Sequence, residues 1–327
     1  MVLKKLFSKT EEKFFHSNTL QNNERHLGDY IFHNVTRLFA FFVLGLMLVM
    51  FLELFIESLP SINKFGLSFI TSSEWNPVKD KYGALPFIFG TVYSSILALM
   101  IALPLSIGVA VFLTEVAPTW LEQPVSILVE LLAAIPSIVY GLFGIFVLAP
   151  FLKNVVEPFL QTHFGFLPFF KGSFYGFGML SAALILSIMI LPIITSISRD
   201  VMKAIPDSLR EGAYALGATK WETIKIVLIS SRSGVLGATL LGFGRAIGET
   251  MAVTMVIGNR PEISLSLFDA GHTMASVLAN EFTEATSSLY VSSLMEIGLL
   301  FFLITIIINS IARLIVNNVT KKYGKIA

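Results

Sequence analysis

Long runs of mostly apolar residues recur along the chain and constrain its fold more than any other feature. Six runs of about 20 residues or more lie at Leu38–Ser58, Leu85–Leu113, Val125–Leu152, Phe174–Ile197, Val235–Ile257 and Ser292–Val316. A helix of that length crosses the hydrocarbon core of a bilayer while satisfying its own backbone hydrogen bonds. The sequence therefore predicts an all-α polytopic membrane protein with six transmembrane helices.

The composition supports a membrane protein and excludes several kinds of site. Hydrophobic residues make up 54% of the 327-residue chain and charged residues only 14%, whereas a soluble domain carries about 25% charged residues. Cysteine is absent, so disulfides, thiolate nucleophiles and cysteine-based metal sites are excluded. The five histidines show no metal-ligand spacing, and we expect no metal site. A net charge of +1 argues against a globally basic nucleic-acid binder.

Lysines and arginines indicate which loops face the cytoplasm, because cytoplasmic loops are enriched in both. Six precede the first span, six lie between the fourth and fifth spans, and four follow from Arg313 onwards, against six in the loops of the opposite side. Both termini are therefore predicted to be cytoplasmic. The connection between the second and third spans, EVAPTWLEQP, falls on the cytoplasmic side by this count, although it has no basic residue.

The same pattern suggests a division of the chain. We expect a polar cytoplasmic tail over residues 1–36, a transmembrane domain over 37–316 and a second cytoplasmic tail over 317–327. The first tail does not have the pattern of a signal peptide, because no apolar run follows its early lysines before Arg37.

The connection between the fourth and fifth spans, residues 198–233, has the pattern of two short helices. Ser208 and Glu211 have the spacing of a capping box, in which a hydroxyl and a carboxylate satisfy free backbone donors at a helix start. Thr219 and Glu222 repeat that spacing. The sequence therefore predicts that one helix begins near each pair.

Small residues separate and line these two helices. Gly217 suits the left-handed residue that ends the first helix. Gly212 and Ala213 form a small-residue surface that another protein could approach closely, and we expect Trp221 to pack within the loop. The pattern also fits an amphipathic hairpin lying on the membrane. A DNA-binding helix-turn-helix is disfavoured, since the segment has few basic residues and is tethered between two spans.

Two charges lie within the fifth apolar run, LLGFGRAIGETMAVTMVIGN. Arg245 and Glu249 are four residues apart, so on a continuous helix they share a face. Small residues that let another helix approach surround them, at Ala238, Gly242, Gly244, Gly248 and Ala252. Because charges are costly in a bilayer, we expect both to face protein or a water-filled path.

The residues alone leave two interpretations of this pair open. In the first, Arg245 and Glu249 form a buried ion pair that holds helices together. In the second, the planar guanidinium of Arg245 binds an anion in transit, and Glu249 orients it and prevents the anion from being held too tightly.

The loop resembles the EAA motif of binding-protein-dependent ABC importer permeases, with Glu211-Gly212-Ala213 followed by Gly217. Glycine replaces the first alanine of that motif, and VLIS stands where the family commonly ends in I-x-L-P. The resemblance implies a type I ABC importer permease fold. It also implies that Glu211, Gly212, Ala213 and Gly217 dock a cytoplasmic ATPase.

Two further segments, GFGRAIGETMAVTMVIGN and AAIPSIVYGLFG, resemble the phosphate-importer permeases of the Pst system. The continuation Met251-Ala252-Val253 favours the PstC-type over the PstA-type family. The resemblance covers about residues 37–316, with the ABC transmembrane type-1 core at about 85–316. It implies a multi-pass permease of the bacterial cytoplasmic (inner) membrane that forms half of a phosphate pathway, with Arg245, Glu249, Thr250 and Tyr140 as pathway residues.

The sequence has no G-x-x-x-x-G-K-[ST] stretch, so it lacks that device for holding ATP. We therefore expect a non-catalytic subunit without a cofactor, and ATP hydrolysis on another polypeptide. The resemblance implies as partners a PstA-type permease, two copies of a PstB-type ATPase and a PstS-type phosphate-binding protein, besides membrane lipid and without nucleic acid.

Two alternatives remain open at this point. The transported anion could be another oxyanion, such as sulfate, molybdate or phosphonate. A secondary anion transporter or channel could instead use Arg245 and Glu249 as a relay. The loop from Glu211 to Gly217 argues against this second class, because a stand-alone carrier has no need of an ATPase-docking motif.

Overall fold

The computed structural model describes residues 27–323, and the predicted all-α class is confirmed in this range. The only strand-like pairing described is one isolated bridge between Asn76 and Lys81. The longer helices are α2 (Leu27–Phe65), α4 (Leu85–Val111), α5 (Thr119–Ala134), α9 (Met179–Lys203), α11 (Lys220–Gly248) and α14 (Ser288–Tyr323). The shorter ones are α3 (Ser68–Thr71), α6 (Ser137–Phe143), α7 (Ala149–Phe151), α8 (Glu157–Phe164), α10 (Asp207–Ala215), α12 (Met251–Val256) and α13 (Met274–Glu281).

Short turns of other helical types connect some of these elements. Turns of π-helix lie at Phe112–Val116 after α4 and at Gly144–Leu148 and Leu152–Val156 between α6, α7 and α8. Turns of 3-10 helix lie at Pro77–Lys79 and Pro168–Phe170. Most of the predicted tail over residues 1–36 lies outside the described residues, as do residues 324–327.

Six helical segments of the described chain are long and apolar enough to cross a membrane, as predicted. They are Gly28–Phe65, Leu85–Val116, Ser137–Phe164, Met179–Lys203, Lys220–Gly248 and Ser288–Asn318. Each overlaps one of the six predicted runs, but the third and fifth differ from the prediction in where they begin and end.

The chain forms two compact units that meet within α2, between Glu53 and Leu54. In the first unit the described residues form one continuous helix, in which Arg37 Nη2 lies 2.9 Å from His33 Nε2. The second unit contains the rest of the described helices.

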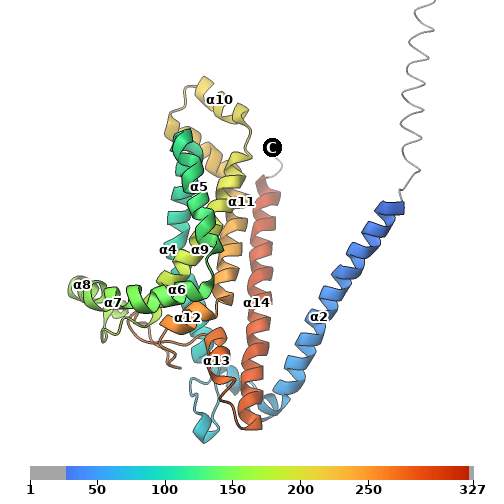
Figure 1. Ribbon diagram of the computed structural model, residues 1–327, viewed down its shortest axis with the longest axis vertical. Helices are drawn as coiled ribbons and strands as arrows, with labels where there is room; N and C mark the ends of the chain where they lie inside the picture. The colour runs from blue at the N-terminus through green and yellow to red at the C-terminus, as the bar shows by residue number, and fades with distance from the viewer. Residues whose placement is uncertain (1–26, 324–327) are drawn as a thin grey trace, which may run out of the picture. The chain divides into compact units, whose positions relative to one another are not determined.

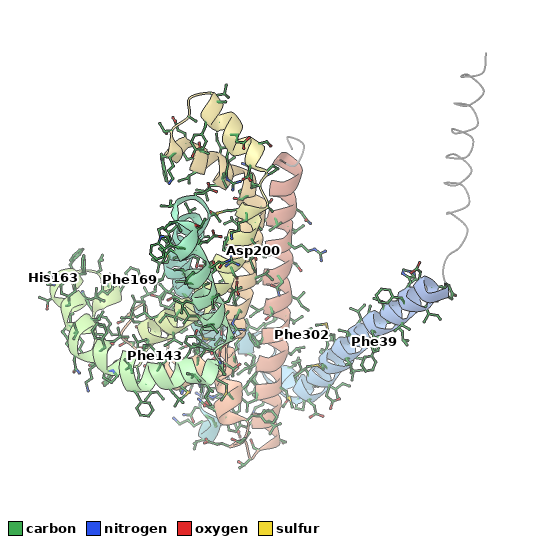
Figure 2. All side chains as sticks on the ribbon, turned by 45° about the horizontal axis from the view of Figure 1, so that its top comes forward. Phe39, Phe143, His163, Phe169, Asp200 and Phe302 are labelled. Atoms are coloured by element: carbon green, nitrogen blue, oxygen red, sulfur yellow. The ribbon has the colours of Figure 1, made fainter. Side chains whose placement is uncertain are left out.

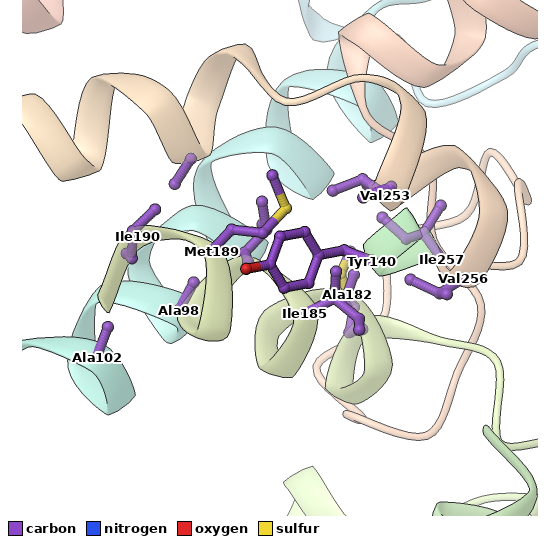
Figure 3. Close-up of a cluster of buried hydrophobic side chains, with 14 of the residues drawn as sticks. Ala98, Ala102, Tyr140, Ala182, Ile185, Met189, Ile190, Val253, Val256 and Ile257 are labelled. Atoms are coloured by element: carbon purple, nitrogen blue, oxygen red, sulfur yellow. The ribbon is translucent and has the colours of Figure 1, made fainter. Parts of the chain in front are cut away.

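Helix α9 is the central helix of the second unit and packs against both α4 and α11 (Figure 1). Its core side chains include Ile185 and Ile190, which are fully buried. They face the small side chains of Ala98 and Ala102 on α4 (Figure 3). Alanines one turn apart let the two helix backbones approach closely, and close packing is what drives helix association where water is absent.

Hydroxyl groups add polar contacts between α4 and α9 beside prolines in each helix. Ser106 Oγ donates to the Leu191 carbonyl oxygen over 3.2 Å, and Thr195 Oγ1 donates to the Ser106 carbonyl oxygen over 3.4 Å. Pro104 and Pro192 lie close by in sequence and have no backbone N–H. Neighbouring serine and threonine side chains compensate for such prolines in membrane helices.

The predicted third span, Val125–Leu152, is not one helix. Helix α5 ends at Ala134, and both Ile135 and Pro136 have extended backbone angles before α6 begins at Ser137. Proline disfavours a helical conformation in the residue before it, which explains why the chain breaks here instead of bending. In Figure 1, α5 lies along the bundle while α6 turns away from its direction.

The fifth span is also displaced from the predicted Val235–Ile257. The second helix of the loop continues into the span as one helix, α11, which begins at Lys220. That helix ends at Gly248, and the remaining predicted residues form the separate short helix α12 and its flanks.

Candidate functional site

The candidate site lies at the break between α11 and α12. Glu249 follows the last helical residue and has an extended backbone, with φ −72° and ψ 127°. Its carboxylate oxygen Oε1 accepts a hydrogen bond from the backbone N–H of Ala252 over 3.2 Å. Glu249 thus satisfies a free donor at the start of α12, in the manner of a helix cap.

The ion pair between Arg245 and Glu249, one of the two interpretations that the sequence left open, does not form in this structure. The expectation assumed one continuous helix, but the break after Gly248 takes Glu249 off the face that carries Arg245. No ion pair joins the two side chains among the described residues.

Arg245 is exposed on the surface of the chain. Its guanidinium makes no hydrogen bond or ion pair within the part of the chain that the structure describes. Its positive charge lies within electrostatic range of the Tyr140 hydroxyl on α6. The five N–H donors of the fork therefore remain available to a molecule outside this chain.

Tyr140 and Thr250, also predicted as pathway residues, already have hydrogen-bond partners within the chain. Tyr140 is 6% exposed and packs beside Met189 and Ile185 in the core around α9 (Figure 3). Its hydroxyl donates to the Leu132 carbonyl oxygen over 2.7 Å, across the break at Pro136. Thr250 Oγ1 lies 3.5 Å from the Gly248 carbonyl oxygen.

The small residues around Arg245 do not form one stripe. A Cβ at Gly242 would lie 2.6 Å from Ile194 on α9, so this glycine permits the contact between α11 and α9. Gly141 on α6 similarly admits α12, because a Cβ there would lie 3.3 Å from the Ala252 Cα. Gly248, one turn from Arg245, has no other atom near its missing side chain. The face that carries Arg245 is therefore open.

Both helices predicted for the docking loop are present, but only one of the two predicted capping boxes forms. Thr219 Oγ1 accepts from the Glu222 backbone over 3.4 Å, and the Glu222 carboxylate accepts from the Thr219 backbone over 2.7 Å, which confirms the second capping box. Gly217 has φ +83°, as expected for the residue that ends the first helix. The box predicted at Ser208 is wrong, because Pro206 occupies the cap position of α10 and no side chain caps the helix.

The surface of this loop is more apolar than predicted. Gly212 and Glu211 are exposed, whereas Ala213 is buried. Leu216 is 91% exposed and Trp221 is 60% exposed, with the Lys225 ammonium above its ring, so Trp221 does not pack within the loop. Two exposed apolar side chains thus flank Gly217, the residue that ends α10.

Sequence reasoning missed how α10 is attached. Arg210 of α10 donates three hydrogen bonds to Glu115. Nη2 donates to Oε1 over 2.9 Å, and Nε donates to Oε1 over 3.2 Å and to Oε2 over 3.4 Å. The Glu115 carboxylate raises the pKa of Arg210 above its ordinary value. The available signal was the absence of any basic residue beside the three glutamates at 115, 122 and 130.

No group of three or more His, Asp or Glu side chains that could hold a metal ion occurs among residues 27–323. Arg245 and the loop around α10 are therefore the two features left for a functional interpretation.

Comparison with known proteins gives the family. Residues 102–325 match the family described as binding-protein-dependent transport system inner membrane component. The phosphate transport system permease protein PstC of Mesorhizobium japonicum is 49% identical, over 91% of this chain and 93% of that protein. The PstC of Pasteurella multocida is 47% identical, over 92% and 95%. A probable PstC of Methanocaldococcus jannaschii is 37% identical, over 83% and 89%.

A solved structure shows the same fold. One chain of the inward-facing MetNI methionine ABC transporter superposes with a TM-score of 0.52 at 17% identity, over 72% of this chain and 94% of that chain. The sequence relatives and this likeness agree on a multi-pass helical protein of the inner membrane. The chain belongs to the family of binding-protein-dependent transport system inner membrane components and has the fold of a type I ABC importer permease.

Proposed function

We propose that this chain is the permease subunit of an ATP-driven ABC importer for inorganic phosphate and forms half of the translocation pathway. The observation that carries the proposal is Arg245, an exposed guanidinium without a partner in the described chain, within an apolar span. An arginine in such a place is costly unless an anion or a partner chain meets it. The relatives named as phosphate permeases supply the anion.

In this proposal the two charged residues have different roles. The planar fork of Arg245 matches two oxygens of a phosphate in shape as well as charge. Glu249 holds the start of α12 through the Ala252 N–H and so fixes the backbone break beside the guanidinium. Because its carboxylate does not neutralise Arg245, the positive charge stays available for the anion. Thr250 contributes a hydrogen bond at the same break, through the Gly248 carbonyl oxygen, whereas the Tyr140 hydroxyl bridges the separate break between α5 and α6.

ATP hydrolysis then belongs to another polypeptide, since this sequence has no phosphate-binding glycine loop. We propose that the ATPase docks on Glu211, Gly212, Ala213 and Gly217 and on the exposed Leu216 beside them. The partners are a PstA-type permease, two copies of a PstB-type ATPase and a PstS-type phosphate-binding protein. This chain is the non-catalytic subunit of that assembly.

Uptake by the reconstituted complex tests the proposal. Proteoliposomes that contain all four kinds of subunit should accumulate labelled phosphate only when ATP is supplied, and excess sulfate or molybdate should not compete. Uptake without ATP would indicate a secondary transporter or channel. Competition by sulfate or molybdate at equal concentration would assign the site to another oxyanion.

A further inference from the structure

Three ion pairs form a line between the segment around α5 and the segment from α9 to α10. Arg210 Nη2 lies 2.9 Å from Glu115 Oε1, Arg199 Nη2 lies 3.1 Å from Glu130 Oε1, and Lys203 pairs with Glu122. We call these three pairs the acid–base ladder. Asp200 follows Arg199 in α9 and also pairs with it. Its label in Figure 2 locates the Arg199 end of the ladder.

Every glutamate of the first segment and every basic residue of the second takes part in the ladder. Residues 112–134 contain three acidic residues and no basic ones, and residues 199–210 contain three basic residues. Each of the three glutamates pairs with one of the three basic residues. The two segments run antiparallel along the ladder, because a glutamate that lies later in the chain pairs with a basic residue that lies earlier. Arg199 and Arg210 also pair with Asp200 and Asp207 of their own segment, but the three pairs between the segments match these segments in a single register.

The Glu115–Arg210 pair is the best buried rung. The side chains of Glu115 and Arg210 are 9% and 17% exposed, whereas those of Glu122 and Lys203 are 26% and 45% exposed. Arg210 also donates to the carbonyl oxygens of Met202 and Ile205, over 3.0 and 2.8 Å. Its guanidinium therefore joins the end of α9, the start of α10 and the corner after α4.

Apolar packing cannot by itself hold α10 in place. Ala213 is the single buried residue of α10, while Leu209 is 39% exposed and Tyr214 is 51% exposed. The side chain of Arg210 adds polar contacts from α10 to Glu115 and to the carbonyl oxygens of Met202 and Ile205. The Arg210–Glu115 pair is thus a direct side-chain link between α10 and the corner after α4.

From α5 the contacts continue to the candidate site. Leu132, near the end of α5, accepts the Tyr140 hydroxyl of α6 across the Pro136 break. Gly141, the next residue of α6, lies against Ala252 of α12. The backbone N–H of Ala252 in turn donates to the Glu249 carboxylate. Glu249 lies four residues after Arg245 in the sequence. A contiguous set of contacts therefore connects α10 with the break beside Arg245.

We propose that the acid–base ladder transmits the movement of α10 to α5 and from there to the α11–α12 break, with Glu115 and Arg210 as its principal positioning residues. This inference rests on the proposed function, because it assumes that an ATPase moves α10. The experiments below measure the coupling between α10 and phosphate import directly.

The first measurement is the number of phosphate ions imported for each ATP hydrolysed by the reconstituted complex. In Glu115→Gln the amide cannot hold the guanidinium as a carboxylate does, so the complex should hydrolyse ATP while the ratio falls about tenfold, a typical size for a coupling factor. The matched control is Glu74→Gln, which removes the exposed Glu74–Lys81 pair outside the ladder. Its ratio should match that of the unmutated complex.

The second measurement does not depend on phosphate. The chain lacks cysteine, so spin labels can be placed at Ser208→Cys on α10 and Leu128→Cys on α5, both of which are exposed. The distance between the labels should show one narrow distribution in the unmutated background with and without ATP. It should broaden when Glu115→Gln is added.

The outcomes separate the two proposals. An unmutated complex that imports no phosphate with ATP would contradict the proposed function, while the label distances would still test the ladder. An unchanged import ratio in Glu115→Gln, or a label distance that stays narrow in it, would overturn the ladder as a transmitting element. If Glu115→Gln fails to assemble, Arg210→Lys keeps the positive charge but loses the forked contact with Glu115, and an unchanged import ratio in that variant would overturn the proposal.

Discussion

Two glycines of α4 show how closely single residues of this molecule approach their neighbours. Gly90 lies against the loop before α13, where a Cβ would come within 2.1 Å of the His272 carbonyl oxygen. Gly108, in the same helix, has no atom within 4 Å of the equivalent position. The same substitution should therefore have opposite effects at the two sites.

Gly90→Ala is expected to lower stability by about 1–3 kcal/mol, the usual cost of overpacking against atoms that cannot move aside. Gly108→Ala should raise stability by about 0.5–1 kcal/mol, because alanine loses less conformational entropy in a helix than glycine does. Thermal unfolding of the purified variants in detergent measures both. Equal unfolding temperatures for the two variants would contradict the packing at Gly90.

His272 predicts a dependence of stability on pH. It is 2% exposed, contacts the Phe87 ring and has no hydrogen-bond partner for either ring nitrogen. Burial lowers the pKa of His272 to about 4. The unfolded chain binds the proton more tightly than the folded chain does. The stability that comes from burying the neutral imidazole is therefore fully present above about pH 6.5 and is lost as the pH falls toward 4.

At pH 5 the free energy of unfolding should therefore be lower by about 2 kcal/mol. The figure follows from about 1.36 kcal/mol for each pH unit below the pKa of histidine in the unfolded chain, which is about 6.5. His272→Leu should make the unfolding temperature fall less between pH 7.5 and 5. His163→Leu is the control, since His163 is exposed. An identical fall in His272→Leu and in the unmutated chain would contradict the buried neutral imidazole.

Single residues were predictable where the chemistry is local. Thr219 and Glu222 lie within one turn of each other, and no other residue prevents their capping box. At Ser208 the neighbouring Pro206 takes the cap position, which is a competition that spacing alone does not show. Arg245 was found from its charge, but its lack of a partner depends on the backbone break after Gly248, which hydropathy does not reveal.

At the scale of elements, the docking surface around α10 gives the clearest prediction. A Cβ at Gly212 meets no atom within 4 Å, so the fold has room for a large side chain there. Gly212→Trp should leave the chain folded and inserted while blocking close approach of the ATPase.

Co-purification with the ATPase measures this effect. The yield of ATPase bound to Gly212→Trp should fall to background, and the yield with Val78→Trp should not change. Val78 is the control because it is 95% exposed and lies outside the predicted docking loop. Normal recovery of the ATPase with Gly212→Trp would place the docking surface elsewhere.

The elements themselves were predictable in number and less so in extent. Hydropathy gives six spans because each must be apolar for about 20 residues. It does not show that the polar start of α11 continues into the fifth span, since a helix can leave the membrane without a break in its backbone. It also predicted one third span over Val125–Leu152, whereas extended angles at Ile135 and Pro136 separate α5 from α6.

At the scale of the whole molecule, the acid–base ladder accounts for the connection that has no basic residue. Glu115 and Glu122 in and beside EVAPTWLEQP pair with Arg210 and Lys203, which belong to the basic segment after α9. Paired residues place the two connections at one end of the bundle. The orientation that the basic residues predict is therefore consistent across both loops.

That orientation can be tested directly because the chain has no cysteine. Single cysteines at Lys79 and Lys220, both exposed, should differ in reaction with an impermeant thiol reagent in intact cells. We expect labelling at position 79 and none at 220 until the cells are lysed. Labelling at 220 but not at 79 in intact cells would reverse the topology and both predicted termini.

The most direct test of the account is phosphate uptake by the complete complex with Arg245 replaced. Arg245→Gln and Arg245→Lys should both assemble with the ATPase but lose uptake by about 10–100-fold, the value of one or two charged hydrogen bonds, because neither offers the bidentate fork. Glu249→Gln should keep most of the uptake, since its amide oxygen can still accept from the Ala252 N–H. The double variant should stay inactive, because no ion pair exists to be relieved. Uptake by the Arg245→Gln complex near the unmutated rate would contradict the claim that this guanidinium meets the transported anion.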